Sequence, residues 1–189
     1  MKTTTSVFSS ALALALLLGA SATAQAQPQG LDVGQVNLDE AYEPGPLTPG
    51  KLFIRAVLDD NDTENFINHV LTNTVTIRVE DGGTTAGVDK FDYTATLTNC
   101  FQTLRGAVCI DDSSGKRTTG IITRWRNFPD VWQVKLRVKD LTNLDTGFGP
   151  LTGPVVVTVV HGQREREDDV LATDCSAKKN GARLRCKAK

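Results

Sequence analysis

The sequence predicts an all-β fold of two duplicated antiparallel β-sandwich units, immunoglobulin-like in the broad sense. Two observations support this prediction. A similar twelve-residue segment occurs twice, at residues 71–82 and 151–162, and we call the two copies the first and the second phrase. Each copy has the pattern of a strand closed by a glycine turn. Segments of alternating apolar and polar residues recur after residue 50, whereas no amphipathic helix of convincing length is seen. The two units would lie side by side or merge into one body.

Residues 1–26 have the layout of a secretory signal peptide. Lys2 is followed by polar residues, by an apolar run at residues 11–18 and by small residues that end at Ala26, where we expect cleavage. The apolar run is about half of the roughly 20 residues that a membrane-spanning helix needs. We therefore expect a secreted or periplasmic protein with no transmembrane segment in the mature chain.

Residues 27–50 are rich in proline and glycine, which is typical of an extended lead-in, and could add one edge strand over residues 32–38. The first repeat is predicted at residues 51–112 and the second at residues 113–189. At the same offset of 80 residues that relates the two phrases, the apolar segment 54–58 corresponds to 134–138. The second phrase is apolar on both faces, so we expect it to lie centrally, against the other repeat.

The four cysteines form two pairs with similar spacing, Cys100 with Cys109 and Cys175 with Cys186. An even number of cysteines in an exported chain predicts disulfides, and these spacings do not suit a zinc site. Each repeat would then end in a hairpin closed by a disulfide. Pairing between the repeats is the alternative.

The two tryptophans flank a predicted hairpin between residues 125 and 132. With the turn at Phe128 and Pro129, Trp125 would face Trp132 across the hairpin. The two rings would either cap the core or form an exposed platform for a sugar ring or a partner protein. The opposite face would carry cations that either hold an anionic surface polymer such as a polysaccharide or are simply solvated. These cations are Arg124, Arg126, Lys135, Arg137 and Lys139.

The loop at residues 59–65 brings together four carboxylates, Asp59, Asp60, Asp62 and Glu64. Calcium requires oxygen ligands of this kind, although the loop lacks the glycine and the distal glutamate of an EF-hand. Calcium is therefore the one cofactor that the sequence suggests, and a plain polar loop is the alternative.

Charge and motifs exclude several functional classes. The chain has 21 basic and 22 acidic residues, a net charge of −1 that argues against a general nucleic-acid binder. Neither His69 nor His161 is flanked by a nucleophile motif. We expect a non-catalytic protein with a binding, adhesive or structural role, whose partner is a cell-surface polysaccharide or protein. The alternative is a small secreted hydrolase or enzyme inhibitor, which would place one of these histidines beside a carboxylate in a deep pocket.

Overall fold

The computed structural model describes residues 30–39, 50–59, 66–82, 91–112, 117–125, 128–141, 153–178 and 183–188. Within these ranges the chain forms twelve strands, one α-helix and one 3-10 turn. None of the helical segments there has the length and apolarity to cross a bilayer. The predicted signal peptide lies outside the described residues, as does most of the predicted lead-in.

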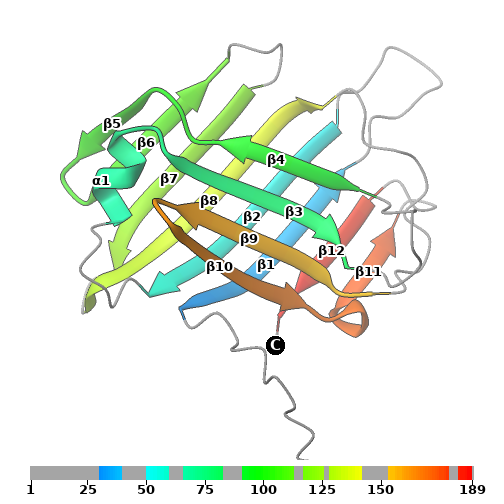
Figure 1. Ribbon diagram of the computed structural model, residues 1–189. Coiled ribbons are helices and arrows are strands. Elements are labelled where there is room, and N and C mark those ends of the chain that lie inside the picture. The colour runs from blue at the N-terminus through cyan, green and yellow to red at the C-terminus, as the bar shows by residue number, and fades with distance from the viewer. Residues whose placement is uncertain are drawn as a thin grey trace, which may run out of the picture.

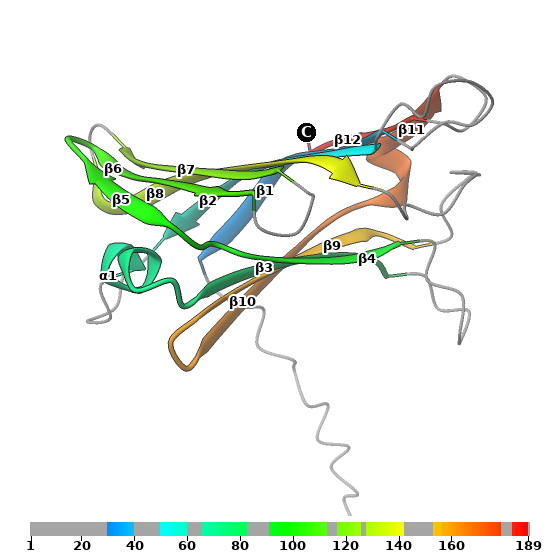
Figure 2. The same cartoon turned by 90° about the horizontal axis from the view of Figure 1, so that it is seen from above.

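The strands form two antiparallel sheets that are stacked in two layers (Figures 1 and 2). The large sheet has the order β11-β12-β1-β2-β8-β7-β6-β5, and the small sheet has the order β10-β9-β3-β4. The large sheet contains β1 (Leu31–Asp39), β2 (Gly50–Asp59), β5 (Cys100–Thr103), β6 (Gly106–Asp111), β7 (Arg117–Trp125), β8 (Phe128–Leu141), β11 (Cys175–Lys178) and β12 (Arg183–Lys187). The small sheet contains β3 (Val75–Asp81), β4 (Asp92–Thr96), β9 (Val155–His161) and β10 (Arg164–Val170).

The all-β class is confirmed, and the two sheets form one joined body. Both halves of the chain contribute to each sheet, because β2 pairs with β8 and β3 pairs with β9. The two phrases of the sequence are therefore neighbouring strands at the centre of the small sheet. In the second phrase, Val156 and Val160 are half-buried on the outer face rather than enclosed.

The pairing registers contain the same offset that relates the two phrases. Arg78 pairs with Thr158 in the small sheet, and Arg55 pairs with Lys135 in the large sheet. The members of each pair are 80 positions apart. The large sheet also has the same kind of strand order from either end. From one end, the hairpin β11–β12 is followed by β1 and β2. From the other end, the hairpin β5–β6 is followed by β7 and β8.

The sequence suggested β1 as an edge strand. In the structure, β1 pairs with β12 on one side and with β2 on the other. Its pairing with β2 shifts register between Val33 and Gln35. Leu31 and Val33 are buried before the shift, and the buried positions resume at Val36 after it. This irregularity breaks the period of two that would have marked a fully paired strand.

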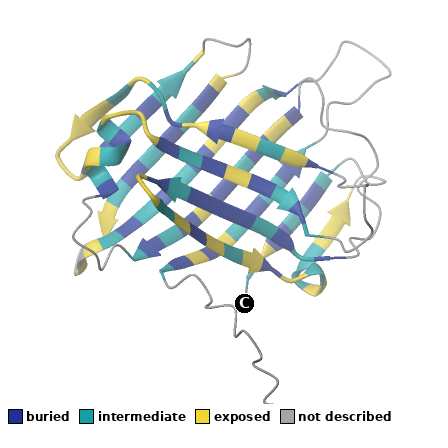
Figure 3. Ribbon diagram, viewed as in Figure 1, coloured by how far each residue is buried: buried dark blue, intermediate teal, exposed yellow. Residues whose placement is uncertain are grey.

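The core lies between the two layers, where the inward residues of the central strands are buried (Figure 3). The helix α1 (Phe66–Leu71) covers one end of this core. Phe66 is fully buried, and its ring lies 6.4 Å from that of Trp132 and 5.1 Å from that of His161, measured between centroids. A helix of six residues is too short to show a helical period in the sequence.

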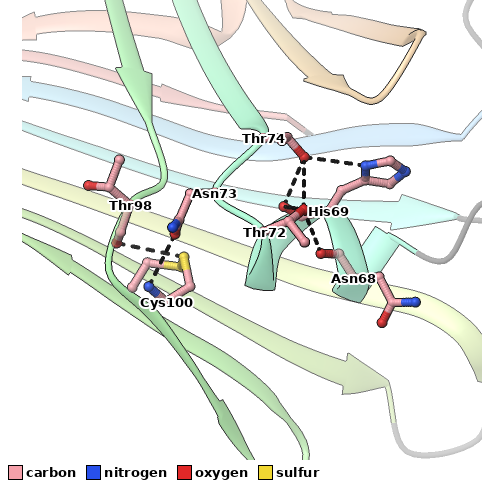
Figure 4. The surroundings of a disulfide bond; sticks show 8 residues. Asn68, His69, Thr72, Asn73, Thr74, Thr98 and Cys100 are labelled. Atoms are coloured by element: carbon pink, nitrogen blue, oxygen red, sulfur yellow. Dashed lines mark hydrogen bonds between the residues drawn. A yellow bond between two sulfur atoms is a disulfide. The ribbon is translucent and has the colours of Figure 1, made fainter.

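Both predicted disulfides are confirmed, and each lies within one hairpin. Cys100–Cys109 joins β5 to β6, and Cys175–Cys186 joins β11 to β12, so both edge strands of the large sheet are attached to their neighbours. The first disulfide lies near the end of α1, where the Asn73 side chain accepts a hydrogen bond from the Cys100 backbone N–H at 3.4 Å (Figure 4). The disulfides agree with an exported protein.

Replacing both Cys175 and Cys186 by serine is expected to lower the free energy of unfolding by about 2 to 3 kcal/mol, because the unfolded chain then regains the freedom of a closed loop of about ten residues. Urea denaturation followed by far-UV circular dichroism measures the change. The corresponding Cys100 and Cys109 double variant should give a similar value, since its loop is of similar length. An unchanged midpoint in both variants would contradict this expectation.

Candidate functional site

The outer face of the large sheet carries a concentration of cations. Strand alternation produces it: Leu52 and Ile54 of β2 point into the core, so Lys51, Phe53 and Arg55 point outward. The pairing registers align cations of neighbouring strands across the sheet. We call this surface the basic face, and its cations are Lys51, Arg55, Arg117, Lys135, Arg137, Lys139, Lys178, Arg183, Arg185 and Lys187.

Asp39 of β1 lies among these cations and is held by two of them. The Nε and Nη2 atoms of Arg183 lie 2.8 and 3.2 Å from its two carboxylate oxygens. Arg185 approaches the Oδ1 atom through Nη2 at 3.1 Å. Both oxygens of Asp39 are therefore engaged, and the carboxylate fixes two guanidinium groups at one side of the basic face.

A hollow of about 270 Å³ opens on the basic face, where β1, β2, β8 and β12 lie side by side. The Arg137 guanidinium lies 5.5 Å from the centroid of the Phe53 ring, within the range of a cation–π contact. Among the described residues, Lys51, Arg137 and Lys139 make no ion pair. The hollow is lined by Asn37, Asp39, Lys51, Leu52, Phe53, Arg137, Val138, Lys139 and Arg185.

Comparison with known proteins gives no relative for this chain. No protein-family model, no curated protein and no solved structure matches it. The site is therefore described from its own residues.

The predicted cation cluster is brought together only in part. Lys135, Arg137 and Lys139 share the outer face of β8, as their spacing predicts. Arg124 instead pairs with Trp132 and lies over its ring, with the guanidinium carbon 5.3 Å from the ring centroid. Arg126 lies outside the described residues. The remaining cations of the basic face come from β2, β7, β11 and β12, whose place in the same sheet as β8 was not evident from the sequence.

The two tryptophans do not form a platform. Trp132 is only 5% exposed and packs in the core, whereas Trp125 is 41% exposed. The prediction that Trp125 faces Trp132 is wrong, because the register between β7 and β8 differs by one residue from the predicted one and places Arg124, not Trp125, opposite Trp132. A shift of one residue moves a side chain to the other face of a sheet, which separates the two rings.

Acidic residues gather on the outer face of the small sheet, away from the basic face. Glu165, Glu167 and Asp169 are exposed there on β10. Arg78 of β3 forms ion pairs with Glu80 at 2.7 Å and with Asp92 at 2.8 Å. The Arg78 hydrogen bond lowers the pKa of the Asp92 carboxyl, partial burial opposes this effect, and the Arg78 charge adds to it. A chain of nearly zero net charge therefore has two oppositely charged faces.

The two histidines lie together at the end of the core that α1 covers. His69 of α1 and His161 of β9 have ring centroids 5.7 Å apart, and His161 is fully buried. The Nδ1 atom of His69 lies 3.3 Å from the hydroxyl of Thr74, which itself donates to the backbone carbonyl of His69 (Figure 4). No motif in the sequence predicts a contact between two histidines that are so far apart in the chain. The contact depends on α1 packing against β9.

The predicted calcium loop lies mostly outside the described residues. Asp59 ends β2 and is half-buried, whereas Asp60, Asp62 and Glu64 fall in the range that the structure does not describe. Within the described ranges, no three histidine, cysteine or acidic side chains are grouped to hold a metal ion. Calcium binding by this loop stays a prediction.

Proposed function

We propose that this protein is an exported, non-catalytic binding protein whose basic face holds an acidic polysaccharide at the cell envelope or outside the cell. One observation supports this proposal most directly: Lys51, Arg137 and Lys139 converge on one open hollow and have no ion pair among the described residues. Cations placed together on an exposed surface repel one another, and an anionic partner relieves this repulsion.

The layout of the basic face suits an extended polymer. Cations lie opposite one another on adjacent strands, Arg55 beside Lys135 and Lys139 beside Arg117. Neighbouring strands lie about 4.8 Å apart, so charges recur at short, regular intervals across the sheet. An acidic polysaccharide also carries charges at regular intervals along an extended chain, which allows several contacts to form at once.

Other anionic partners fit this surface less well. The described residues include five exposed large hydrophobic side chains, which lie on β5, in the β5–β6 turn, on β7, at the start of β8 and just after β10: Phe101, Leu104, Trp125, Phe128 and Leu171. The cation-rich strands β2 and β12 thus lack the apolar anchors that membrane binding would use, and in β8 the exposed Phe128 lies at the start of the strand, before its cations. Single-stranded nucleic acid needs free aromatic faces for stacking, whereas Arg137 lies over the Phe53 ring.

The proposal also includes the duplicated architecture predicted from the sequence. The shared offset of 80 in both sheets and the strand order that reads alike from either end support an origin from two copies of one six-stranded unit. The first unit would then run from β1 to β6, which adds β1 to the repeat predicted at residues 51–112. The immunoglobulin-like comparison applies to these units only in the broad sense of two antiparallel layers.

The binding proposal predicts a salt-dependent affinity for acidic polymers. The Lys135→Gln/Lys139→Gln variant should bind polygalacturonate or dextran sulfate about tenfold more weakly at low ionic strength, a loss of about 1.4 kcal/mol. Biolayer interferometry on immobilised polymer measures this affinity, with neutral dextran as the blank. Added salt should weaken binding by the wild type more than by the variant, because the wild type makes more ionic contacts.

A second variant provides the matched control. Arg105→Gln/Arg164→Gln removes the same charge from the β5–β6 turn and from the first residue of β10, neither of which belongs to the basic face. Its affinity should stay within about twofold of the wild type, since exposed charges beyond a Debye length of about 10 Å contribute little. Equal losses in both variants, or wild-type binding that does not respond to salt, would contradict the proposal.

A further inference from the structure

We infer that the hollow on the basic face is a subsite for one acidic sugar unit, a single ring that carries one carboxylate or sulfate group. This inference rests on the proposed function and adds where on the face the polymer is recognised. It rests on three properties of the hollow: its size, the cations that converge on it and the polar groups of its wall.

The size of the hollow limits the ligand to one ring. Its volume of about 270 Å³ is below the roughly 300 Å³ at which pockets for drug-sized ligands begin. The hollow opens to solvent on the outer surface of the sheet, so further units of a polymer can continue across the basic face. One unit would then be held in the hollow, and its neighbours would make only surface contacts.

The cations of the hollow suit one anionic group. Lys51 on β2 and Lys139 on β8 extend from adjacent strands, and each ends in a mobile point charge. Arg137 is restricted by its contact with the Phe53 ring, so its planar set of N–H donors is already oriented. A guanidinium held in this way forms paired hydrogen bonds to a carboxylate or a sulfate at a lower entropic cost.

The wall of the hollow adds groups that a simple inorganic anion would not need. Asp39 accepts hydrogen bonds from Arg183 and forms an ion pair with Arg185. This ion pair fixes the Arg185 side chain at the edge of the hollow. The Oδ1 atom of Asn37 is buried and has no hydrogen-bond partner among the described residues. A rotation of this amide would bring the acceptor to a ring hydroxyl of the ligand. Buried acceptors of this kind are normally satisfied, and a ring hydroxyl of the ligand would satisfy this one.

Binding of short oligosaccharides tests this inference. Three trisaccharides serve as probes: trigalacturonate, a sulfated galactose trimer and the neutral galactose trimer. Amide chemical shifts in nuclear magnetic resonance titrations give both the affinity and the location of binding. At least one acidic trimer should shift the amides of Phe53 and Arg137 and bind at least tenfold more tightly than the neutral trimer. The anionic group is identified by which of the acidic trimers binds.

Two variants with the same change of charge locate the subsite. Arg137→Gln removes a cation from the hollow, whereas Arg55→Gln removes one from the same face outside it. The first should lower the affinity for the acidic trimer at least tenfold, and the second should lower it much less, because Arg55 can contact only the units that flank the one held in the hollow. Both residues are exposed, so each variant should fold, and thermal melts check this. Phe53→Leu should also weaken trimer binding, since Arg137 then loses the ring that restricts it.

The outcomes distinguish this inference from the proposed function. If the wild type binds acidic polymer but Arg137→Gln and Arg55→Gln lose trimer affinity equally, the subsite is wrong and the binding face stands. Equal binding of the neutral and acidic trimers also overturns the subsite. If the wild type binds neither acidic polymer nor acidic trimer, the proposed function fails, and the subsite fails with it.

Discussion

Replacing Trp132 by alanine is expected to lower the free energy of unfolding by about 3 to 5 kcal/mol. The side chain is 5% exposed and packs against Phe66, and the surrounding strands cannot move inward to fill the space that it leaves. The variant also removes the ring below the Arg124 guanidinium. Urea denaturation followed by far-UV circular dichroism measures the loss without relying on tryptophan fluorescence.

Trp125→Ala is the matched control for this variant. Its ring is 41% exposed, so the same substitution should cost less than about 1 kcal/mol. Equal losses at both positions would show that the two rings pack in similar surroundings, which would contradict the register between β7 and β8. The pair of variants therefore tests the placement of this hairpin as well as the stability of the core.

Replacing Gly106 by alanine is expected to destabilise the protein by about 3 kcal/mol or more. Gly106 has a φ angle of 156°, which residues other than glycine rarely adopt. An added Cβ would also overlap the backbone carbonyl oxygen of Ile122 in the neighbouring strand. The overlap is with backbone, so it can be relieved only by separating β6 from β7. Thermal and urea denaturation measure the effect.

Gly34→Ala gives the comparison for this substitution. An added Cβ at Gly34 would lie 3.7 Å from its nearest neighbouring atom, the carbonyl oxygen of Arg55, which is an ordinary contact. The change should alter the free energy of unfolding by less than about 1 kcal/mol, since alanine also restricts the unfolded chain. If Gly106→Ala were tolerated as well as Gly34→Ala, the close approach of β6 to β7 would be wrong.

The sequence predicted those features that depend on local periodicity. Alternation along β8 placed Lys135, Arg137 and Lys139 on one face, and this placement needs no knowledge of neighbouring strands. The disulfides could also be predicted from the sequence, because the members of each pair are close in the chain and their hairpins are short. The second phrase lies centrally, as expected, but its outer valines, Val156 and Val160, are only half-buried, so the expectation that both of its faces are covered is wrong.

The features that failed depend on irregularities of single residues. The register between β7 and β8 differs by one residue from the predicted one, which separates the two tryptophans, and a register shift in β1 obscures the pattern of a strand that pairs on both sides. No propensity predicts where such a shift occurs, since it is set by packing with the neighbouring strand. Each shift reverses the faces of the residues beyond it, so a small local error has a large consequence for the predicted site.

The hollow itself could not be derived from the sequence. Its residues come from β1, β2, β8 and β12, and it exists only because these four strands are neighbours in the large sheet. Asn37, Arg137 and Arg185 are far apart in the chain, and no motif connects them. Long-range pairing of this kind is decided by the whole sheet, which is why the cations of β8 were identified but their partners on the basic face were not.

The pairing of β1 with β12 also governs how the chain reaches its fold. The first described strand needs the last one as a partner, and β6 of the first half pairs with β7 of the second. Neither half can therefore complete its part of the large sheet before the other half has been synthesised. Because contacts between distant segments form slowly, folding should be a late and concerted event. Export of the chain before folding would suit this order, with the two disulfides closing the outer hairpins once the sheet has formed.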